Sequence, residues 1–179
     1  SGPHTVDDAM FMAHGLVATD AGLLVAWRES FNGTHPTPSG FIRALDPLGA
    51  PVGATLELLT PPVAEGPSLS AAADGLFTVG MCRRFGSDDY PSWLRVDALG
   101  DRVGTEHVVS ETTESCTTHD TAPQMLWTGK RQLFSWITSS SGKLVWIESS
   151  AADGSDASSL LVRKNGDLSA PPRLVQFGD

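Results

Sequence analysis

Short apolar runs, separated by turn-forming residues, dominate the pattern of hydrophobic and polar positions along the chain. The runs are 4–7 residues long, rich in Val, Leu, Ile, Phe and Trp, and bounded by Gly, Pro, Asn, Asp and Ser. Dipeptides that favour tight turns lie between them: Asp-Gly at 74–75 and 153–154, and Asn-Gly at 32–33 and 165–166. No window of 12 residues has a convincing helical period; residues 7–16 come nearest, but Gly15 interrupts them. The pattern predicts an all-β fold.

The same order of runs and turns occurs at least twice. The frame Asp-x-Leu-Gly-x-x-Val-Gly stands at 46–53 and again at 97–104, which is 51 residues later. Trp27 and Met81 hold matching places in the preceding runs and lie 54 residues apart. Repeats of this length with three to four short strands predict a sheet of about four strands per unit. We divide the chain into units of approximately 15–63, 64–118 and 119–179.

The third unit aligns with the others in two ways. In the first alignment, residues 123–127 and 133–136 are its first two strands, and Trp136 follows Met81 by 55 residues. In the second alignment, Gly142 to Val145 belong to the second strand, 160–163 form the later strand and 173–175 the last. An insertion near 111–131 then precedes the unit. We favour the second alignment and keep the first open.

These units resemble the repeat of bacterial extracytoplasmic β-propellers. The residues that carry the resemblance are Asp20, Gly22, Trp27, Arg43, Asp46 and Gly49 in the first unit and Pro67, Asp74, Gly75, Arg95, Asp97 and Gly100 in the second. The second unit departs from the pattern by placing Met81 where Trp is usual. The resemblance implies propeller-like blades and is nearly silent on activity, because one fold hosts many functions. A β-trefoil, which also has three four-stranded repeats, is the alternative fold.

Blade-like packing predicts roles for the large and basic residues. Trp27, Trp136 and Trp146 are expected to fill the core between sheets, and Arg43 and Arg95 to bind neighbouring carbonyls or carboxylates. Propellers usually close with about 4–8 blades, so three units leave two apolar faces open. We therefore expect the chain to be part of a larger ring, or to complete one with another copy of itself or a separate chain.

Polar loops between the second and third strands are expected to share one rim, at residues 29–39, 83–92 and 149–158. The predicted ligand-binding residues are Asn32, His35, Asp88, Asp89, Tyr90 and Trp93. Tyr90 and Trp93 are aromatic rings that suit stacking on a sugar. Asp88, Asp89, Asp153 and Asp156 offer oxygen ligands for Ca²⁺, but they lack the spacing of a dedicated calcium loop, so solvated turns are favoured and no cofactor is expected.

The two cysteines carry information about the compartment. Cys82 follows the second strand of its unit, and Cys116 follows the last strand by several residues. Antiparallel topology places both at one rim, which predicts a disulfide; loop-closure entropy gives it about 3–4 kcal/mol. A disulfide implies an oxidising, extracytoplasmic location.

Composition narrows the function classes. The chain has 179 residues, 12 Lys and Arg against 21 Asp and Glu, and a net charge of −9, which disfavours nucleic acid and anionic lipid as partners. No apolar run reaches the length of a membrane span, and no nucleophile, metal-protease or phosphate-loop motif occurs. We expect a non-enzymatic secreted or surface protein that binds a partner or glycan through its rim. The alternatives are a structural subunit of a multi-chain assembly and a propeller hydrolase such as a glycosidase.

Overall fold

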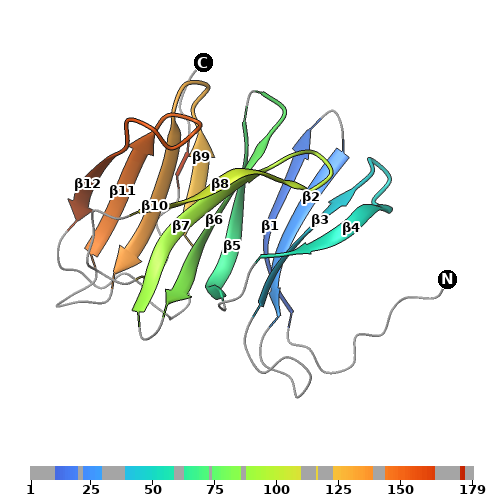
Figure 1. Ribbon diagram of the computed structural model, residues 1–179, viewed down its shortest axis with the longest axis horizontal. Coiled ribbons are helices and arrows are strands. Elements are labelled where there is room, and N and C mark those ends of the chain that lie inside the picture. Colours follow the sequence, from blue (N-terminus) through green and yellow to red (C-terminus); the bar gives the residue numbers. More distant parts are fainter. Residues whose placement is uncertain are drawn as a thin grey trace.

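The computed structural model contains three four-stranded antiparallel sheets (Figure 1). It describes residues 11–19, 22–29, 39–58, 63–72, 74–85, 88–109, 116, 123–138, 144–163 and 174–175. The strands are β1 (Phe11–Thr19), β2 (Gly22–Glu29), β3 (Ser39–Leu45), β4 (Pro51–Glu57), β5 (Val63–Ala71), β6 (Phe77–Phe85), β7 (Asp88–Val96), β8 (Arg102–Val108), β9 (Gln124–Trp127), β10 (Gln132–Thr138), β11 (Leu144–Ser150) and β12 (Ser158–Arg163). We call the sheets β1–β4, β5–β8 and β9–β12 blade 1, blade 2 and blade 3.

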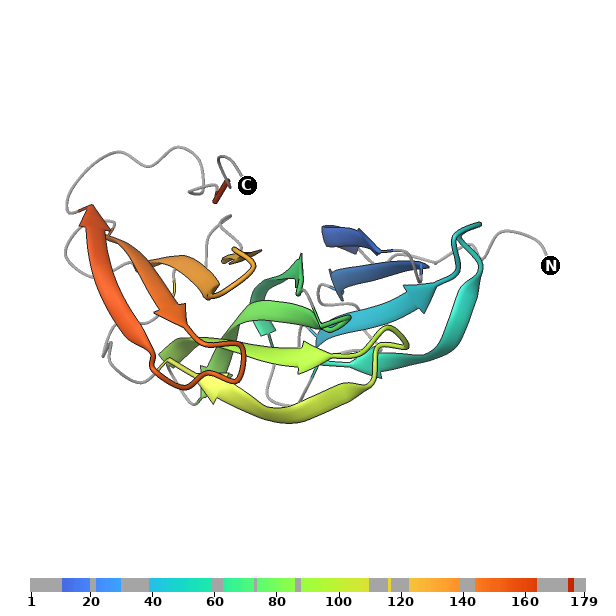
Figure 2. The ribbon, with the colours of Figure 1, turned by 90° about the horizontal axis from the view of Figure 1, so that it is seen from above.

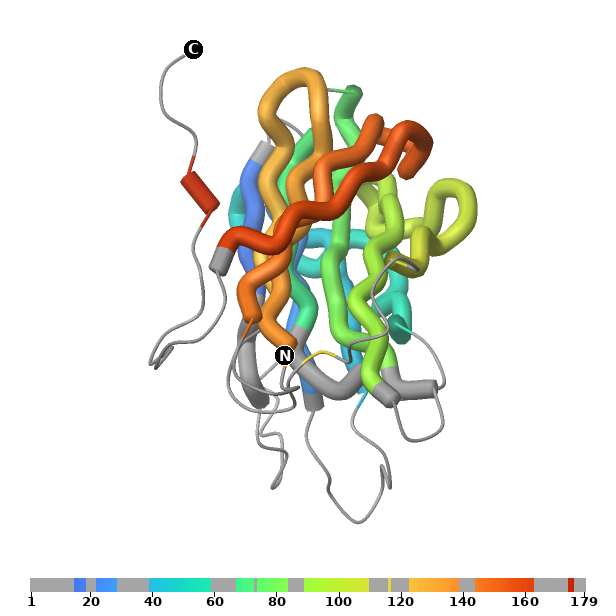
Figure 3. The backbone as a smooth tube through the Cα atoms, turned by 90° about the vertical axis from the view of Figure 1, so that its left-hand side faces the viewer, coloured from blue at the N-terminus to red at the C-terminus, as the bar shows by residue number. Residues whose placement is uncertain are grey.

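Each strand pairs with its neighbour in the sequence, so every blade is a simple meander. The blades stand side by side in an open arc when seen from above (Figure 2). The first strands adjoin one another, since β5 contacts both β1 and β9, and the side view places them one behind another (Figure 3). This arrangement confirms the predicted all-β fold with propeller-like blades. The β-trefoil alternative is wrong, because the strands form three separate sheets.

The repeated frame of Asp and Gly residues forms the turn between the third and fourth strands. Asp46 Oδ1 accepts hydrogen bonds from the amides of Leu48 and Ala50 at 2.9 and 2.8 Å. Gly49 follows with a φ of +84°, a conformation that only glycine adopts freely. The Asp97 turn repeats this geometry, with Gly100 at a φ of +85°. The motif is therefore a side-chain-stabilised turn.

The last glycine of the frame has a different role. Gly53 and Gly104 have φ values of +70° and +76°, and each lies in its fourth strand where the pairing with the third strand shifts register. Such β-bulges bend and twist a strand. The frame thus encodes both the turn and the bend of the outer strand that follows.

Blade 3 follows the first alignment, and our preference for the second was wrong by one strand. The backbone hydrogen bonds at 151–155 repeat those at 46–50 and 97–101, which fixes the register of the third blade. Trp27, Met81 and Trp136 accordingly hold the same position in the second strands β2, β6 and β10. The error arose because β10 and β11 both read as an apolar run around a Trp, so local pattern alone did not rank them.

Alternate residues of each strand point to opposite faces of the blade. We call the face toward the preceding blade the leading face and the face toward the following blade the trailing face. Between blades 1 and 2, the trailing residues Leu24, Ala26 and Ile42 are buried with the leading residues Val79 and Met81 in one apolar cluster. This interface is therefore a conventional hydrophobic core.

Candidate functional site

The interface between blades 2 and 3 contains a buried polar cluster. Glu148 projects from the leading face of blade 3, and Trp93 from the trailing face of blade 2 donates its Nε1–H to Glu148 Oε1 at 3.3 Å. His107 Nε2, from β8, lies 3.1 Å from the same oxygen. The His107 ring also packs against the Trp93 ring, with centroids 4.9 Å apart. The cluster fixes the relative position of the two blades, because one carboxylate oxygen meets groups from both β7 and β8.

Further polar contacts extend along the same interface. Thr78 donates to Gln132 Oε1 at 2.9 Å, and the Trp127 amide donates to Ser70 Oγ at 2.9 Å. All of these bonds join blade 2 to blade 3. Buried hydrogen bonds demand a specific partner at each position, whereas apolar contacts tolerate several. The interface between blades 2 and 3 therefore requires a specific partner at more positions than the apolar interface between blades 1 and 2.

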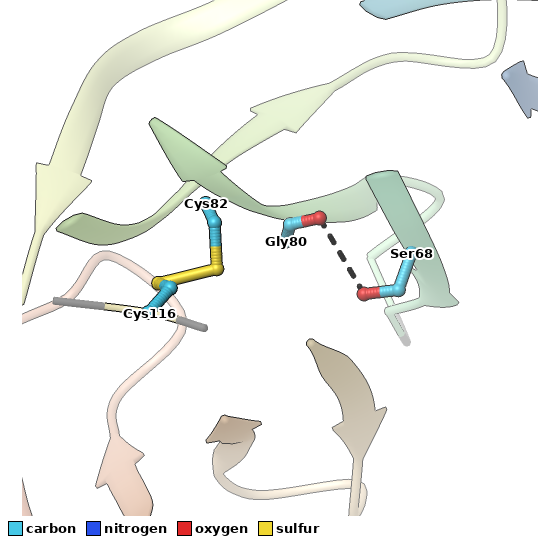
Figure 4. The surroundings of a disulfide bond; sticks show 4 residues. All are labelled: Ser68, Gly80, Cys82 and Cys116. Carbon is cyan, nitrogen blue, oxygen red and sulfur yellow. Dashed lines mark hydrogen bonds between the residues drawn. A yellow bond between two sulfur atoms is a disulfide. The ribbon is translucent and has the colours of Figure 1, made fainter. Parts of the chain in front are cut away.

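The predicted disulfide between Cys82 and Cys116 is present, and it lies at one end of this interface (Figure 4). Its Cα atoms are 6.0 Å apart and both residues are buried. The Cys116 amide donates to the Asp89 carbonyl of β7 at 2.7 Å, and Cys116 also forms an antiparallel bridge with Thr138 of β10. The disulfide therefore holds a residue that connects blade 2 with blade 3.

The predicted ligand-binding residues in 83–92 lie mostly in strands, because β6 and β7 are separated by only residues 86–87. Asp88 begins β7, Asp89 is 4% exposed and Tyr90 is half-buried. Trp93 is 1% exposed and faces blade 3, so its ring offers no surface for a sugar. Asn32 and His35 lie outside the described residues.

The acidic pairs considered for calcium lie at opposite rims. Asp89 is near the β6–β7 connection, whereas Asp153 and Asp156 belong to the β11–β12 turn (Figure 1). The Ser155 hydroxyl and amide donate to Asp153 and lower the pKa of its carboxyl. Asp156 accepts a hydrogen bond from Arg131 at 2.9 Å. Within the part of the chain that the structure describes, no three His, Cys, Asp or Glu residues gather as a metal site.

Two arginines of blade 2 bind carboxylates. Arg95 pairs with Asp74 of the β5–β6 turn, in agreement with the sequence prediction, and Arg83 pairs with Glu106 of β8. Burial raises the pKa of Asp74, but the hydrogen bond and positive charge of Arg95 outweigh it and hold that pKa below its usual value. These pairs stabilise blade 2 internally.

The outward leading face of blade 1 is a largely apolar surface that contacts no other described sheet. Leu23, Val25 and Trp27 of β2 form its centre, and the Trp27 ring stacks on Phe41 with centroids 5.6 Å apart. Leu16 lies opposite Val25 on the same face and is 66% exposed. The equivalent residues in blades 2 and 3 are Leu69 and Met125, and both pack between blades. Blade 1 therefore presents outward a set of positions that are packed between blades elsewhere in the chain.

Sequence reasoning missed Glu148 and His107. The available signal was a lone acidic residue inside the apolar run of β11, which is unusual at a buried strand position. Its two partners are 41 and 55 residues away in the sequence, so only the correct alignment of blade 3 would have brought them together.

The described residues include no helix long and apolar enough to cross a membrane. Comparisons with family models, curated proteins and solved structures find no match to this chain. The class that the fold defines is a repeat-built all-β protein with three propeller-like blades and one disulfide.

Proposed function

We propose that this chain is a non-enzymatic interaction protein that works as part of a larger β-propeller ring. The observation that carries the proposal is the exposure of Leu16. The same repeat position is packed between blades at Leu69 and Met125, and in blade 1 it lies open beside Val25 and Trp27. Burying such a leucine contributes about 1.5–3 kcal/mol, so this face gains from a covering blade.

The disulfide supports an extracytoplasmic site of action. Cys82 and Cys116 are buried and paired, and stable disulfides are rare in reducing compartments. The resemblance of the repeats to those of bacterial extracytoplasmic propellers points the same way. We therefore propose an extracytoplasmic location, which is the periplasm, the cell surface or the outside of the cell.

Hydroxyl-radical footprinting tests the proposal directly, because it reports the solvent exposure of individual side chains. In the assembled state Leu16 is expected to be protected relative to the diluted chain. Leu48, which is 95% exposed in the β3–β4 turn, serves as the internal control and should react equally in both. Equal labelling of Leu16 in every state, in a chain that remains a compact monomer, would remove the basis of the proposal.

Ligand binding by a rim, including glycan binding, stays a separate hypothesis. Of the aromatic residues proposed for it, Tyr90 is half-buried at the β6–β7 end of blade 2. A glycan array with the wild-type chain and Tyr90→Ala measures this directly. Signals that are lost in the variant would support rim binding, and identical signals would exclude Tyr90.

A further inference from the structure

The two internal interfaces follow one rule: the trailing face of a blade meets the leading face of the next. Blade 1 offers Leu24, Ala26 and Ile42, and blade 2 covers them with Val79 and Met81. At the next interface, the trailing face of blade 2 meets the leading face of blade 3 in the same sense. The rule leaves one leading face outward on blade 1 and one trailing face outward on blade 3.

The outward leading face of blade 1 matches the leading face of blade 2. Both have apolar residues at most of the same register positions, and one exception is Arg43, which stands where blade 2 has Leu94. The equivalent pairs are Leu23 with Phe77, Val25 with Val79, Trp27 with Met81 and Leu45 with Val96. Since the blade 2 residues all belong to the apolar core shared with blade 1, the blade 1 face suits the same kind of partner.

The outward trailing face of blade 3 matches the trailing face of blade 1, which is that kind of partner. The equivalent pairs are Leu24 with Leu133, Ile42 with Ile147, Ala44 with Ser149 and Leu56 with Leu160. Ser135 and Ile137 of this face are buried within the chain, so Leu133, Ile147 and Leu160 form its accessible part. Blade 2 differs, because its trailing face carries Thr78, Trp93 and Arg95 at these positions.

Leu160 shows that the part of this face formed by β12 is open to solvent. In blade 1 the equivalent Leu56 packs against the core shared with blade 2. In blade 3, Leu160 lies opposite Ile147 on the trailing face and is 66% exposed. Leu16 and Leu160 thus occupy positions whose equivalents are packed between blades, but both are exposed, and they lie at opposite ends of the arc.

We propose that the leading face of blade 1 binds the trailing face of blade 3 in a second copy of this chain, and that two copies close a six-bladed ring. The inference rests on the proposed function and names the partner. Two identical head-to-tail junctions related by a two-fold axis complete the ring, which satisfies both outward faces at once. Six blades lie within the range in which propellers close, about 4–8.

Sedimentation equilibrium of four proteins tests the pairing. The wild-type chain is expected at about twice its 18.9 kDa mass. Leu16→Asp and Leu160→Asp should each raise the dissociation constant at least about tenfold, because every junction contains one of each residue. Leu48→Asp is the matched control, since Leu48 lies on neither face, and it should dimerise like wild type. At a dilution where every protein is monomeric, urea midpoints equal to that of the wild type would show that all three variants fold, as expected for exposed positions; at higher concentration the dimeric wild type should be the more stable.

Mixing the variants distinguishes head-to-tail from face-to-face pairing. A dimer of Leu16→Asp with Leu160→Asp keeps one junction intact, whereas each variant alone has two damaged junctions. Tagged Leu16→Asp should therefore retain Leu160→Asp better than it retains untagged Leu16→Asp. Wild-type association by Leu160→Asp would overturn the inference, as would a wild-type chain that stays monomeric. If that monomer gained Leu16 protection only with a different chain, the proposed function would stand and the second copy would be excluded.

Discussion

Replacing Gly80 with alanine tests how closely blades 2 and 3 approach. Gly80 lies in the middle of β6 on the trailing face. A Cβ added there would lie 2.6 Å from Met125 Cγ and Sδ and 2.8 Å from Phe134 Cε2, all on blade 3. These separations are far below normal contact, so the side chains of Met125 and Phe134 must move to admit one methyl group. The backbone of Gly80 is in an ordinary conformation, so space alone decides the outcome.

Two opposing terms set the magnitude of the Gly80→Ala effect. Alanine restricts the unfolded chain more than glycine and should add about 0.5–1 kcal/mol of stability. Overpacking a close-packed core costs about 1–3 kcal/mol. Overpacking wins, and we expect a net loss of about 1–2 kcal/mol, which lowers the melting temperature by about 2–8 °C for a chain of this size.

Urea unfolding followed by tryptophan fluorescence measures the loss, and a double-mutant cycle assigns its cause. Met125→Ala removes the side chain that the new methyl group would meet, so Gly80→Ala should cost less in that background. The expected coupling is about 1 kcal/mol in the favourable direction. If Gly80→Ala is as stable as the wild type, or if the cycle shows no coupling, the blades do not meet as described.

Three further predictions concern stability. Reducing the Cys82–Cys116 disulfide should lower the free energy of unfolding by about 3–4 kcal/mol, because the unfolded chain is then no longer cross-linked. Urea unfolding with and without reductant measures the difference, and an unchanged midpoint would contradict the prediction. Asp74→Asn should be less stable than wild type at neutral pH, since the lowered pKa of Asp74 beside Arg95 makes the ionised form stabilising. The difference in stability between wild type and Asp74→Asn should vanish as the pH falls from the usual aspartate pKa of 3.8 through the lowered pKa of Asp74, because the carboxylate is then protonated. A constant difference across this pH window would argue against the pairing of Asp74 with Arg95. Glu148→Ala should cost about 1–3 kcal/mol because the buried Trp93 N–H loses its acceptor, whereas Glu148→Gln, which keeps an amide oxygen, should cost less; equal losses in thermal scans would count against this hydrogen bond.

The sequence was informative where local chemistry determines structure. The Asp-x-Leu-Gly-x-x-Val-Gly frames at 46–53 and 97–104 predicted repeating turns, because each aspartate and glycine acts within a few residues of its own position. The disulfide between Cys82 and Cys116 was predictable as well, since antiparallel strands bring alternate ends to one rim. Local signals of this kind were sufficient for the number of strands per repeat.

Contacts between blades were beyond the reach of the same reasoning. Trp93 was expected to face a ligand because it followed a polar segment, but β6 and β7 extend through that segment and carry the ring into the core. Glu148 and His107 meet only because blade 3 is in the first alignment, which a pattern of apolar runs could not select. Register between distant repeats depends on side-chain fit across the interface, and that information is not local.

Small-angle X-ray scattering of the wild-type chain tests the central claim, that the open arc is half of a closed ring, most directly. At concentrations where the chain is dimeric, we expect a distance distribution that fits a closed six-bladed disc, and Leu16→Asp should give the profile of a single arc. A dimer whose scattering fits two arcs joined at one end, with the Leu16 and Leu160 faces still open, would contradict the account.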